Sequence, residues 1–305
     1  MQPTDIFPRI TIAHLADCIA HEGVVPQWVE RIAANIQEQG VLKNPIIVAR
    51  PDGNQPHSGG EGGTRRALPG GGATRVPVIV VDGMHRFAAL RRLEIPDVVV
   101  YEIDYAAPTV LLEGWDALVF KPFSALPFLR RLAGAIGKGI QPTVAASIEA
   151  AQQAIDRRRA LLAATDRRGR CHLLVSRASP TVEQLVRASE LADRALDAAD
   201  LRPVYVPDSL SAGDFDTTKA TGLVIRPHYT KAEIIKRTLA RKLFPRKSTR
   251  HLIPGRPLRV DLPLTLLRAR IGLAAKNRLL DEHLRWCYAS DRIRYYPESV
   301  FIFAD

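Results

Sequence analysis

The sequence has few cysteines and no long apolar run, and each shortage excludes a class of protein. Its three cysteines, Cys18, Cys171 and Cys287, are widely separated and form no Cys-x-x-Cys pair, so neither a disulfide-stapled domain nor a cysteine-rich zinc site is expected. No apolar stretch approaches the ~18–20 residues that cross a bilayer, and the first residues lack the pattern of a signal peptide. These absences predict a cytoplasmic protein with reduced thiols and no membrane segment.

What remains is the composition of an ordinary globular protein. Hydrophobic residues make up 46% of the 305 residues and charged residues 25%, which excludes disordered and collagen-like chains. At ~100–200 residues per domain, the length corresponds to about two domains. Glycine, lysine and proline interrupt the pattern at 137–141, so we expect a first domain over 1–138 and a second over 139–305.

The net charge of +11 is confined to the second half of the chain. Residues 1–140 carry 14 basic and 14 acidic side chains, whereas residues 141–305 carry 29 and 18. Between Lys219 and Arg259 there are 12 basic residues against the single acid Glu233. Such a field attracts an anion, whether nucleic acid, a membrane surface or a phosphorylated small molecule. Charge alone does not choose among these ligands.

Hydrophobic periodicity predicts an α/β fold. In the first half it predicts helices over 27–40 and 87–93 and strands over 46–48 and 76–81. The glycine-rich stretch 51–75 is interpreted as a flexible hairpin insertion, because no Gly-Lys-Ser/Thr or Gly-x-Gly-x-x-Gly motif marks it as a phosphate loop. In the second half the pattern predicts helices over 143–165, 181–198, 230–242 and within 263–288, and strands over 171–175, 203–206, 222–226 and 300–303.

The most informative stretch is the tight turn between a buried strand and a helix at Asp82-Gly83-Met84-His85-Arg86. A helix N-terminus offers unpaired backbone N–H groups and a partial positive charge. His85 and Arg86 add side-chain donors, so the turn is suited to holding a phosphate group. The alternative is structural: Asp82 caps the helix and Arg86 is a solvated helix residue. The residues alone leave both interpretations open.

The order of these motifs resembles the ParB/sulfiredoxin superfamily. The segment Gly40-Val41-Leu42-Lys43-Asn44-Pro45-Ile46-Ile47-Val48, a hairpin, and then the segment 82–90 follow one another as in that superfamily, over about residues 8–105. The resemblance implies a ParB/sulfiredoxin-like N-terminal domain that binds a nucleotide at 82–86. It also implies a second, basic α/β domain with a cleft between the two. Known members are DNA-partitioning proteins, sulfiredoxins and free-serine kinases.

Residue differences separate these three branches. Sulfiredoxins carry a reactive cysteine immediately before the His-Arg pair, where this chain has Met84, which cannot act as a thiolate. Partitioning proteins carry a Gly-Glu-Arg-Arg box, which this chain replaces by Gly-Met-His-Arg. The chain is similar to siderophore-cluster free-serine kinases, which have Asp-Gly-x-His-Arg in the first domain and Thr-Arg-His in the second. Here these motifs stand at 82–86 and 249–251, and the similarity covers most of the chain except about 51–75 and 140–220.

The resemblance to these kinases implies a role for each motif residue. Glu22 matches a glutamate proposed as general base, which binds serine and accepts its hydroxyl proton; the alternative is an exposed loop acid. Trp115 matches a tryptophan that lines the substrate site, with a plain core residue as the alternative. The remaining assignments place Asp82, His85, Arg250 and His251 in catalysis, Gly83, Met84, His85, Arg86 and Thr249 at the nucleotide, and Thr249, Arg250 and His251 at the substrate as well.

The resemblance therefore predicts a kinase that transfers a phosphoryl group from ATP, or ADP, to the hydroxyl of free L-serine. The product, O-phospho-L-serine, would enter a specialised pathway such as siderophore synthesis. Mg²⁺ is expected with the nucleotide; Asp82 is a candidate to support it, and no metal ligand is assigned. The alternative function is a ParB-type DNA-binding, nucleotide-dependent regulator, whose duplex affinity would fall steeply with salt.

Overall fold

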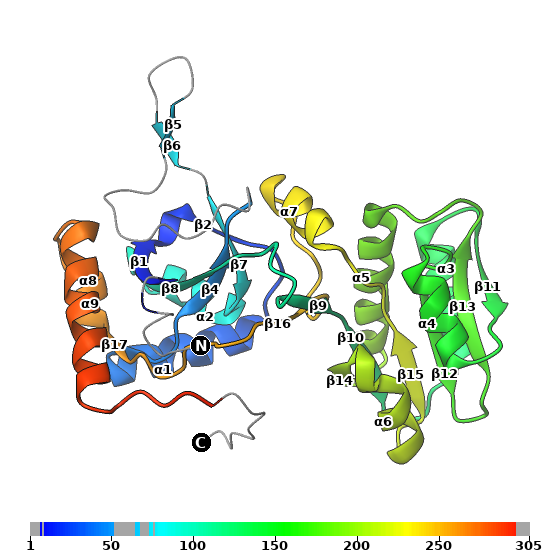
Figure 1. Ribbon diagram of the computed structural model, residues 1–305. Coiled ribbons are helices and arrows are strands. Elements are labelled where there is room, and N and C mark those ends of the chain that lie inside the picture. Colours follow the sequence, from blue (N-terminus) through cyan, green and yellow to red (C-terminus); the bar gives the residue numbers. More distant parts are fainter. Residues whose placement is uncertain (1–6, 8, 52–64, 68–72, 76, 297–305) are drawn as a thin grey trace. The chain divides into compact units, whose positions relative to one another are not determined.

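The computed structural model describes residues 7, 9–51, 65–67, 73–75 and 77–296, and the chain forms two compact units (Figure 1). The first comprises residues 1–110, 237–242 and 253–305, and the second comprises 111–236 and 243–252. This division differs from the expected one near residue 138. Residues 115–136 belong to the second unit because they supply a strand of its sheet and a helix of its core. The last fifty or so residues return to the first unit.

The first unit is built on a five-stranded mixed sheet. In pairing order the strands are β1 (Ile10–His14), β8 (Asp97–Ile103), β4 (Ile46–Ala49), β7 (Val78–Asp82) and β2 (Cys18–Ala20). The β4–β8 and β2–β7 pairs are parallel, and the others are antiparallel. Every residue of β4 and β8 is buried, which explains why apolar residues follow one another without alternation in β4 and at Val98–Val100 of β8.

The helices of the first unit begin and end where local signals place them. Helix α1 (Pro26–Gln39) starts with a proline and ends at Gly40, whose φ of 65° is the left-handed conformation that favours glycine. Helix α2 (Met84–Arg92) follows β7 directly. The stretch predicted within 263–288 divides into α8 (Leu264–Arg268) and α9 (Leu273–Ala289), because the chain leaves the helical conformation before Gly272, the N-cap of α9. A short strand pair, β3 (Val41–Leu42) with β17 (Leu262–Pro263), joins the N-terminal and C-terminal segments of this unit.

Helix α9 is fastened to the sheet by polar contacts with β1 and β8. The side-chain amide of Asn277 accepts from the backbone N–H of Ile12 at 2.8 Å and donates to its carbonyl at 3.0 Å, so it takes the place of a neighbouring strand. Lys276 is fully buried, and its Nζ donates to Asp97 at 2.5 Å and to the Leu267 carbonyl at 2.7 Å. A buried lysine is tolerated only when it is paired in this way.

The second unit contains a six-stranded antiparallel sheet. In pairing order the strands are β11 (Ile140–Val144), β13 (Cys171–Ser176), β12 (Leu162–Asp166), β15 (Gly222–Ile225), β10 (Trp115–Val119) and β14 (Val204–Pro207). Successive residues of its strands enter different cores: Ala117 and Val119 pack with α3 (Ala125–Ile136) and α5 (Val182–Ala198), whereas Leu118 packs with α4 (Ile148–Asp156) and α6 (Ser211–Thr217). This alternation produces a three-layer α/β/α arrangement.

Three further elements complete the second unit's part of the chain. They are the short antiparallel pair β9 (Leu111–Glu113) with β16 (Arg250–Leu252), and α7 (Lys231–Leu239), whose last residues belong to the first unit. Short 3₁₀ turns occur at Leu15–Asp17 and Asp208–Leu210. In the described part of the chain, no helix combines the length and the apolar character that crossing a membrane requires.

One predicted helix needs correction, and other predicted segments lie partly or wholly outside the described residues. The helix predicted over 143–165 is wrong at both ends, because residues 140–144 and 162–166 are strands and only 148–156 are helical. Alanine favours helix, but Ala163 and Ala164 are wholly buried on opposite faces of the sheet, and that burial overrides the propensity. The insertion contains a hairpin of β5 (Arg65–Ala67) and β6 (Ala73–Arg75), as predicted. The rest of its glycine-rich sequence, and the strand predicted at 300–303, lie outside the described residues.

Candidate active site

The predicted strand, tight turn and helix are present around Gly83 in the first unit. β7 ends at Asp82, Gly83 has a φ of 88°, and α2 begins at Met84. A Cβ atom on Gly83 would lie 2.7 Å from Nη2 of Arg86, so the arginine side chain folds back over the glycine. The turn thus requires glycine for its backbone and for the room it leaves. The Met84 side chain is buried, so only its backbone can face a ligand.

The Asp82 carboxylate pairs with two guanidinium groups at this turn. Its Oδ2 accepts from Nη2 of Arg86 at 3.0 Å and from Nη2 of Arg256 at 2.7 Å. The capping alternative for Asp82 is wrong, because the N-cap position of α2 is occupied by Gly83, which has no side chain to cap the helix. Arg86 also donates to the Pro45 carbonyl, and its buried Nε has no hydrogen-bond partner among the described residues. Burial lowers the pKa of Arg86 from its usual value, against the opposing effect of Asp82. Sequence reasoning missed Arg256, whose partner lies 174 positions away.

His85 links the beginnings of two helices. Its Nε2 accepts a hydrogen bond from the backbone N–H of Val25, the N-cap residue of α1, at 3.1 Å. Its ring centroid lies 5.5 Å from that of Trp28, an aromatic side chain that is about half exposed. The accepting role of Nε2 requires a lone pair there, so the imidazole is neutral in this arrangement.

Glu22 lies at the same end of the sheet as Asp82. The parallel pairing of β2 with β7 aligns Ala20 with Val80, and Glu22 and Asp82 each stand two residues further on. Between them, the buried His21 places Nδ1 2.6 Å from the Val80 carbonyl and Nε2 3.9 Å from Glu22. Burial lowers the pKa of His21, while the charges of Glu22 and Asp82 counteract part of that effect. His21, which the sequence analysis did not single out, therefore faces both carboxylates.

The Thr249–His251 element forms part of a strand pair in the second unit. Arg250 stands opposite Glu113 in the β9–β16 register, and its Nη1 donates to the Glu113 carboxylate. Thr249 and His251 are buried on either side of it. The segment is paired with another strand and its Thr249 and His251 side chains are buried, so it is not a solvated basic surface loop. Glu113 was missed because nothing in its local sequence indicates a partner 137 positions away.

Trp115 contacts residues on both sides of Ser248, in and beside the Thr249–His251 element. Its indole Nε1 donates to the Thr249 carbonyl at 2.9 Å. Nζ of Lys247 lies 4.4 Å from the ring centroid, and the guanidinium carbon of Arg250 lies 5.6 Å from it. Trp115 is only partly buried, so it is not a plain core residue. A tryptophan face under two cations is an electrostatically favourable arrangement. Lys247, with a left-handed φ of 58°, was also missed.

A protein-held metal site is not evident in the part of the chain that is described. No group of three or more His, Cys, Asp or Glu side chains there is arranged to hold an ion. The one carboxylate expected to support Mg²⁺, that of Asp82, is already paired with two guanidinium groups.

Comparison with known proteins gives a consistent set of relatives. No family model matches the chain. An ATP-dependent L-serine kinase from Staphylothermus marinus is 22% identical over 250 residues, which cover 82% of this chain and 88% of that protein.

Solved structures resemble the fold. A free serine kinase in complex with AMP has a TM-score of 0.63 and 19% identity, covering 85% of this chain and 93% of its own. A variant free serine kinase, with alanine in place of a glutamate and ADP bound, has a TM-score of 0.62 and 18% identity, covering 85% and 94%. SbnI with a C-terminal truncation, from Staphylococcus aureus, has a TM-score of 0.65 and 18% identity, covering 93% and 98%. This mixed α/β chain therefore shares its fold with serine kinase structures.

Proposed function

We propose that this chain is a free L-serine kinase, which transfers the γ-phosphoryl group of ATP to the serine hydroxyl and releases O-phospho-L-serine and ADP. The relative described as an ATP-dependent L-serine kinase, which aligns over most of both chains, supports this function. The structural observation that carries it is the β2–β7 pairing, which brings Glu22 to the strand end where the Asp82–Arg86 turn begins. A carboxylate beside a phosphate-binding turn is the minimum that phosphoryl transfer to an alcohol needs.

The turn is the proposed nucleotide site. The first N–H groups of α2, at Gly83, Met84 and His85, point out of the helix and carry its positive dipole end. Arg86 adds a buried Nε–H that has no partner in the described structure. A phosphate oxygen there would satisfy that donor. Nε2 of His85 could donate to a phosphate only if that nitrogen were protonated and no longer accepted the hydrogen bond from the Val25 N–H.

Glu22 is the proposed general base. As the serine oxygen attacks, a new oxygen–phosphorus bond forms and the bond from the γ-phosphorus to the bridging oxygen breaks. The electron pair of the broken bond leaves with ADP, and the hydroxyl proton moves to the Glu22 carboxylate. A serine hydroxyl is a poor nucleophile until such a base is within hydrogen-bond reach.

The proposed role of Trp115 and the Thr249–His251 element is to bind serine and stabilise the transferring phosphoryl group. Arg250 offers a planar fork of donors, held by Glu113, and Thr249 and His251 add a hydroxyl and an imidazole. Trp115 supplies an apolar wall whose orientation is fixed by the Thr249 carbonyl. Mg²⁺ enters the proposal as the counter-ion that ATP brings, because the described residues do not fit a dedicated site.

The direct test is to incubate the purified protein with ATP or ADP, Mg²⁺, and L-serine, L-threonine or L-homoserine, and to detect phosphoamino acids by mass spectrometry. We expect phosphoserine with ATP, and far less with the other two acceptors. The Glu22→Gln variant serves as the matched control. Tight, salt-sensitive binding to duplex DNA with no phosphoamino acid from either donor would instead support the DNA-binding regulator.

A further inference from the structure

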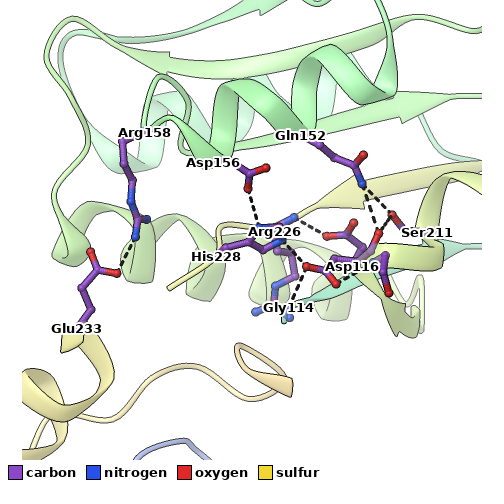
Figure 2. A network of polar contacts seen from close by, with 11 residues as sticks. Gly114, Asp116, Gln152, Asp156, Arg158, Ser211, Arg226, His228 and Glu233 are labelled. Atoms are coloured by element: carbon purple, nitrogen blue, oxygen red, sulfur yellow. Dashed lines mark hydrogen bonds and ion pairs between the residues drawn. The ribbon is translucent and has the colours of Figure 1, made fainter. Parts of the chain in front are cut away.

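A polar network in the second unit surrounds His228, in the loop that follows β15 (Figure 2). Nδ1 of His228 lies 2.7 Å from the carboxylate of Asp156, at the end of α4. Its Nε2 lies 2.8 Å from the carboxylate of Asp208, in the 3₁₀ turn after β14. Nothing in the sequence analysis singled out these residues.

Both nitrogens of His228 face carboxylates, which only accept hydrogen bonds. Nδ1 is hydrogen-bonded to Asp156, whereas Nε2 lies at ion-pair distance from Asp208 without hydrogen-bond geometry. A charged ring is attracted by both carboxylates, so the imidazolium fits this arrangement better than a neutral ring. Burial opposes that charge, but Asp208, Asp156 and the more distant Asp116 outweigh it and raise the pKa of His228 to about 9. The ring is therefore a cation at neutral pH.

Asp208 connects this cation to the backbone at Gly114. The Oδ2 that faces His228 also accepts from the Gly114 N–H at 3.0 Å, and the Asp208 N–H donates to the Gly114 carbonyl at 3.3 Å. A Cβ atom at position 114 would lie 2.7 Å from Cδ2 of His228, so the ring packs directly on the glycine. Gly114 stands between Glu113, which holds Arg250, and Trp115, which contacts Thr249, Lys247 and Arg250.

We propose that His228 is a positioning residue for serine phosphorylation: held between Asp156 and Asp208, its cation fixes Gly114 and, through it, the Glu113–Arg250 pair and the Trp115 ring. The catalytic consequence rests on the proposed kinase function, whereas the effect on Trp115 does not. A further acid that influences His228 is Asp116 on β10, which accepts from the Arg226 N–H at 2.8 Å. The Arg226 guanidinium faces Asp193 instead.

The spectroscopic test follows Trp115 alone. Since the chain has three tryptophans, Trp28→Phe and Trp286→Phe leave Trp115 as the single emitter. Its emission should change as pH rises through about 9, when His228 loses its proton and one carboxylate faces a lone pair. His228→Gln should abolish that transition, and Asp156→Asn, which removes one of the two carboxylates at a half-exposed position, should move it to lower pH.

The kinetic test uses the natural tryptophans. His228→Gln should lower kcat/KM for serine by roughly 10²-fold, as misplacement by about 1 Å does, with nucleotide affinity within about twofold. His14→Gln, which removes another histidine–aspartate pair in the first unit, is the matched control and should leave serine kinetics unchanged.

The outcomes separate this proposal from the proposed function. A Trp115 transition that persists unchanged in both His228→Gln and Asp156→Asn would overturn the positioning role, whatever the enzyme does. If the wild-type protein phosphorylates no serine, the proposed function fails, and the fluorescence titration still decides whether His228 holds Trp115. If His228→Gln does not fold, Asp156→Asn alone provides the shift in midpoint.

Discussion

Replacing Gly83 with alanine tests the geometry of the phosphate turn most directly, because the change adds one methyl group at a point of close approach. At a φ of 88°, an L-residue carries a backbone penalty of ~1–2 kcal/mol. The new Cβ would lie 2.7 Å from Nη2 of Arg86. The guanidinium must therefore move away and weaken its 3.0 Å bond to Asp82. That pair is partly exposed, so its loss adds only about 0.5–1 kcal/mol.

The sum predicts a loss of ~1.5–3 kcal/mol of unfolding free energy, or a fall in Tm of ~2–5 °C for a protein of this size. Thermal unfolding of Gly83→Ala, Arg86→Ala and the double variant forms a cycle that separates the two contributions. In the Arg86→Ala background the methyl meets no guanidinium, so only the backbone penalty remains. We expect a coupling of about 1 kcal/mol between the two sites. Equal costs of Gly83→Ala in both backgrounds would refute the close approach of Arg86 to the glycine.

Three further predictions concern the chemistry and the buried charges. Glu22→Gln keeps the shape of the side chain and removes the base, so kcat should fall by ~10²–10⁴-fold; ATP affinity by calorimetry should change little, and near-normal turnover would remove Glu22 from the mechanism. Arg250→Lys keeps the charge but loses the planar fork that binds Glu113, so serine phosphorylation should fall by at least about tenfold; wild-type rates would mean that charge alone suffices. Burial raises the pKa of Asp116 to about 6, so its contribution to stability is present below pH ~4 and is lost as pH rises through 6. Asp116→Asn should therefore be more stable than wild type at pH 7.5, by roughly 3 kcal/mol, and unfold at a higher temperature, with a smaller difference at pH 4.5. The opposite pH trend in thermal unfolding would contradict this assignment.

The sequence predicts best those elements whose signals are local. Helix α1 ends at Gly40 as its left-handed conformation requires, and the Thr181 cap of α5 is a capping box with Gln184. Both helices depend on residues within one turn of their ends. The strand, turn and helix around Gly83 are similarly local, and the structure confirms them.

The contacts that the sequence did not reveal join residues far apart in the chain. Arg256 with Asp82, Glu113 with Arg250, and His228 with Asp156 are separated by 174, 137 and 72 positions. Asp82 and Arg250 stand in motifs, but their partners Arg256 and Glu113, and the pair His228 and Asp156, lie outside any motif, so periodicity and motif give these four residues no weight. The expected domain boundary failed for a related reason: the glycines near 137–139 mark the end of α3, and a helix end is not a domain end.

The way the chain leaves the first unit at Val110 and returns to it for good only at Ile253, after a brief return at 237–242, has a consequence for biosynthesis. A ribosome completes five strands of the first sheet early, yet β1 then has an unsatisfied edge at Ile12, and Asp97 has no lysine beside it. The groups that meet these needs, Asn277 and Lys276, are translated only after the whole second unit. The second unit, made in between, has its sheet complete by then. The inserted unit is thus the first able to fold, and the nascent first unit carries an open strand edge until α9 has been made. During that interval the edge is exposed to misassociation.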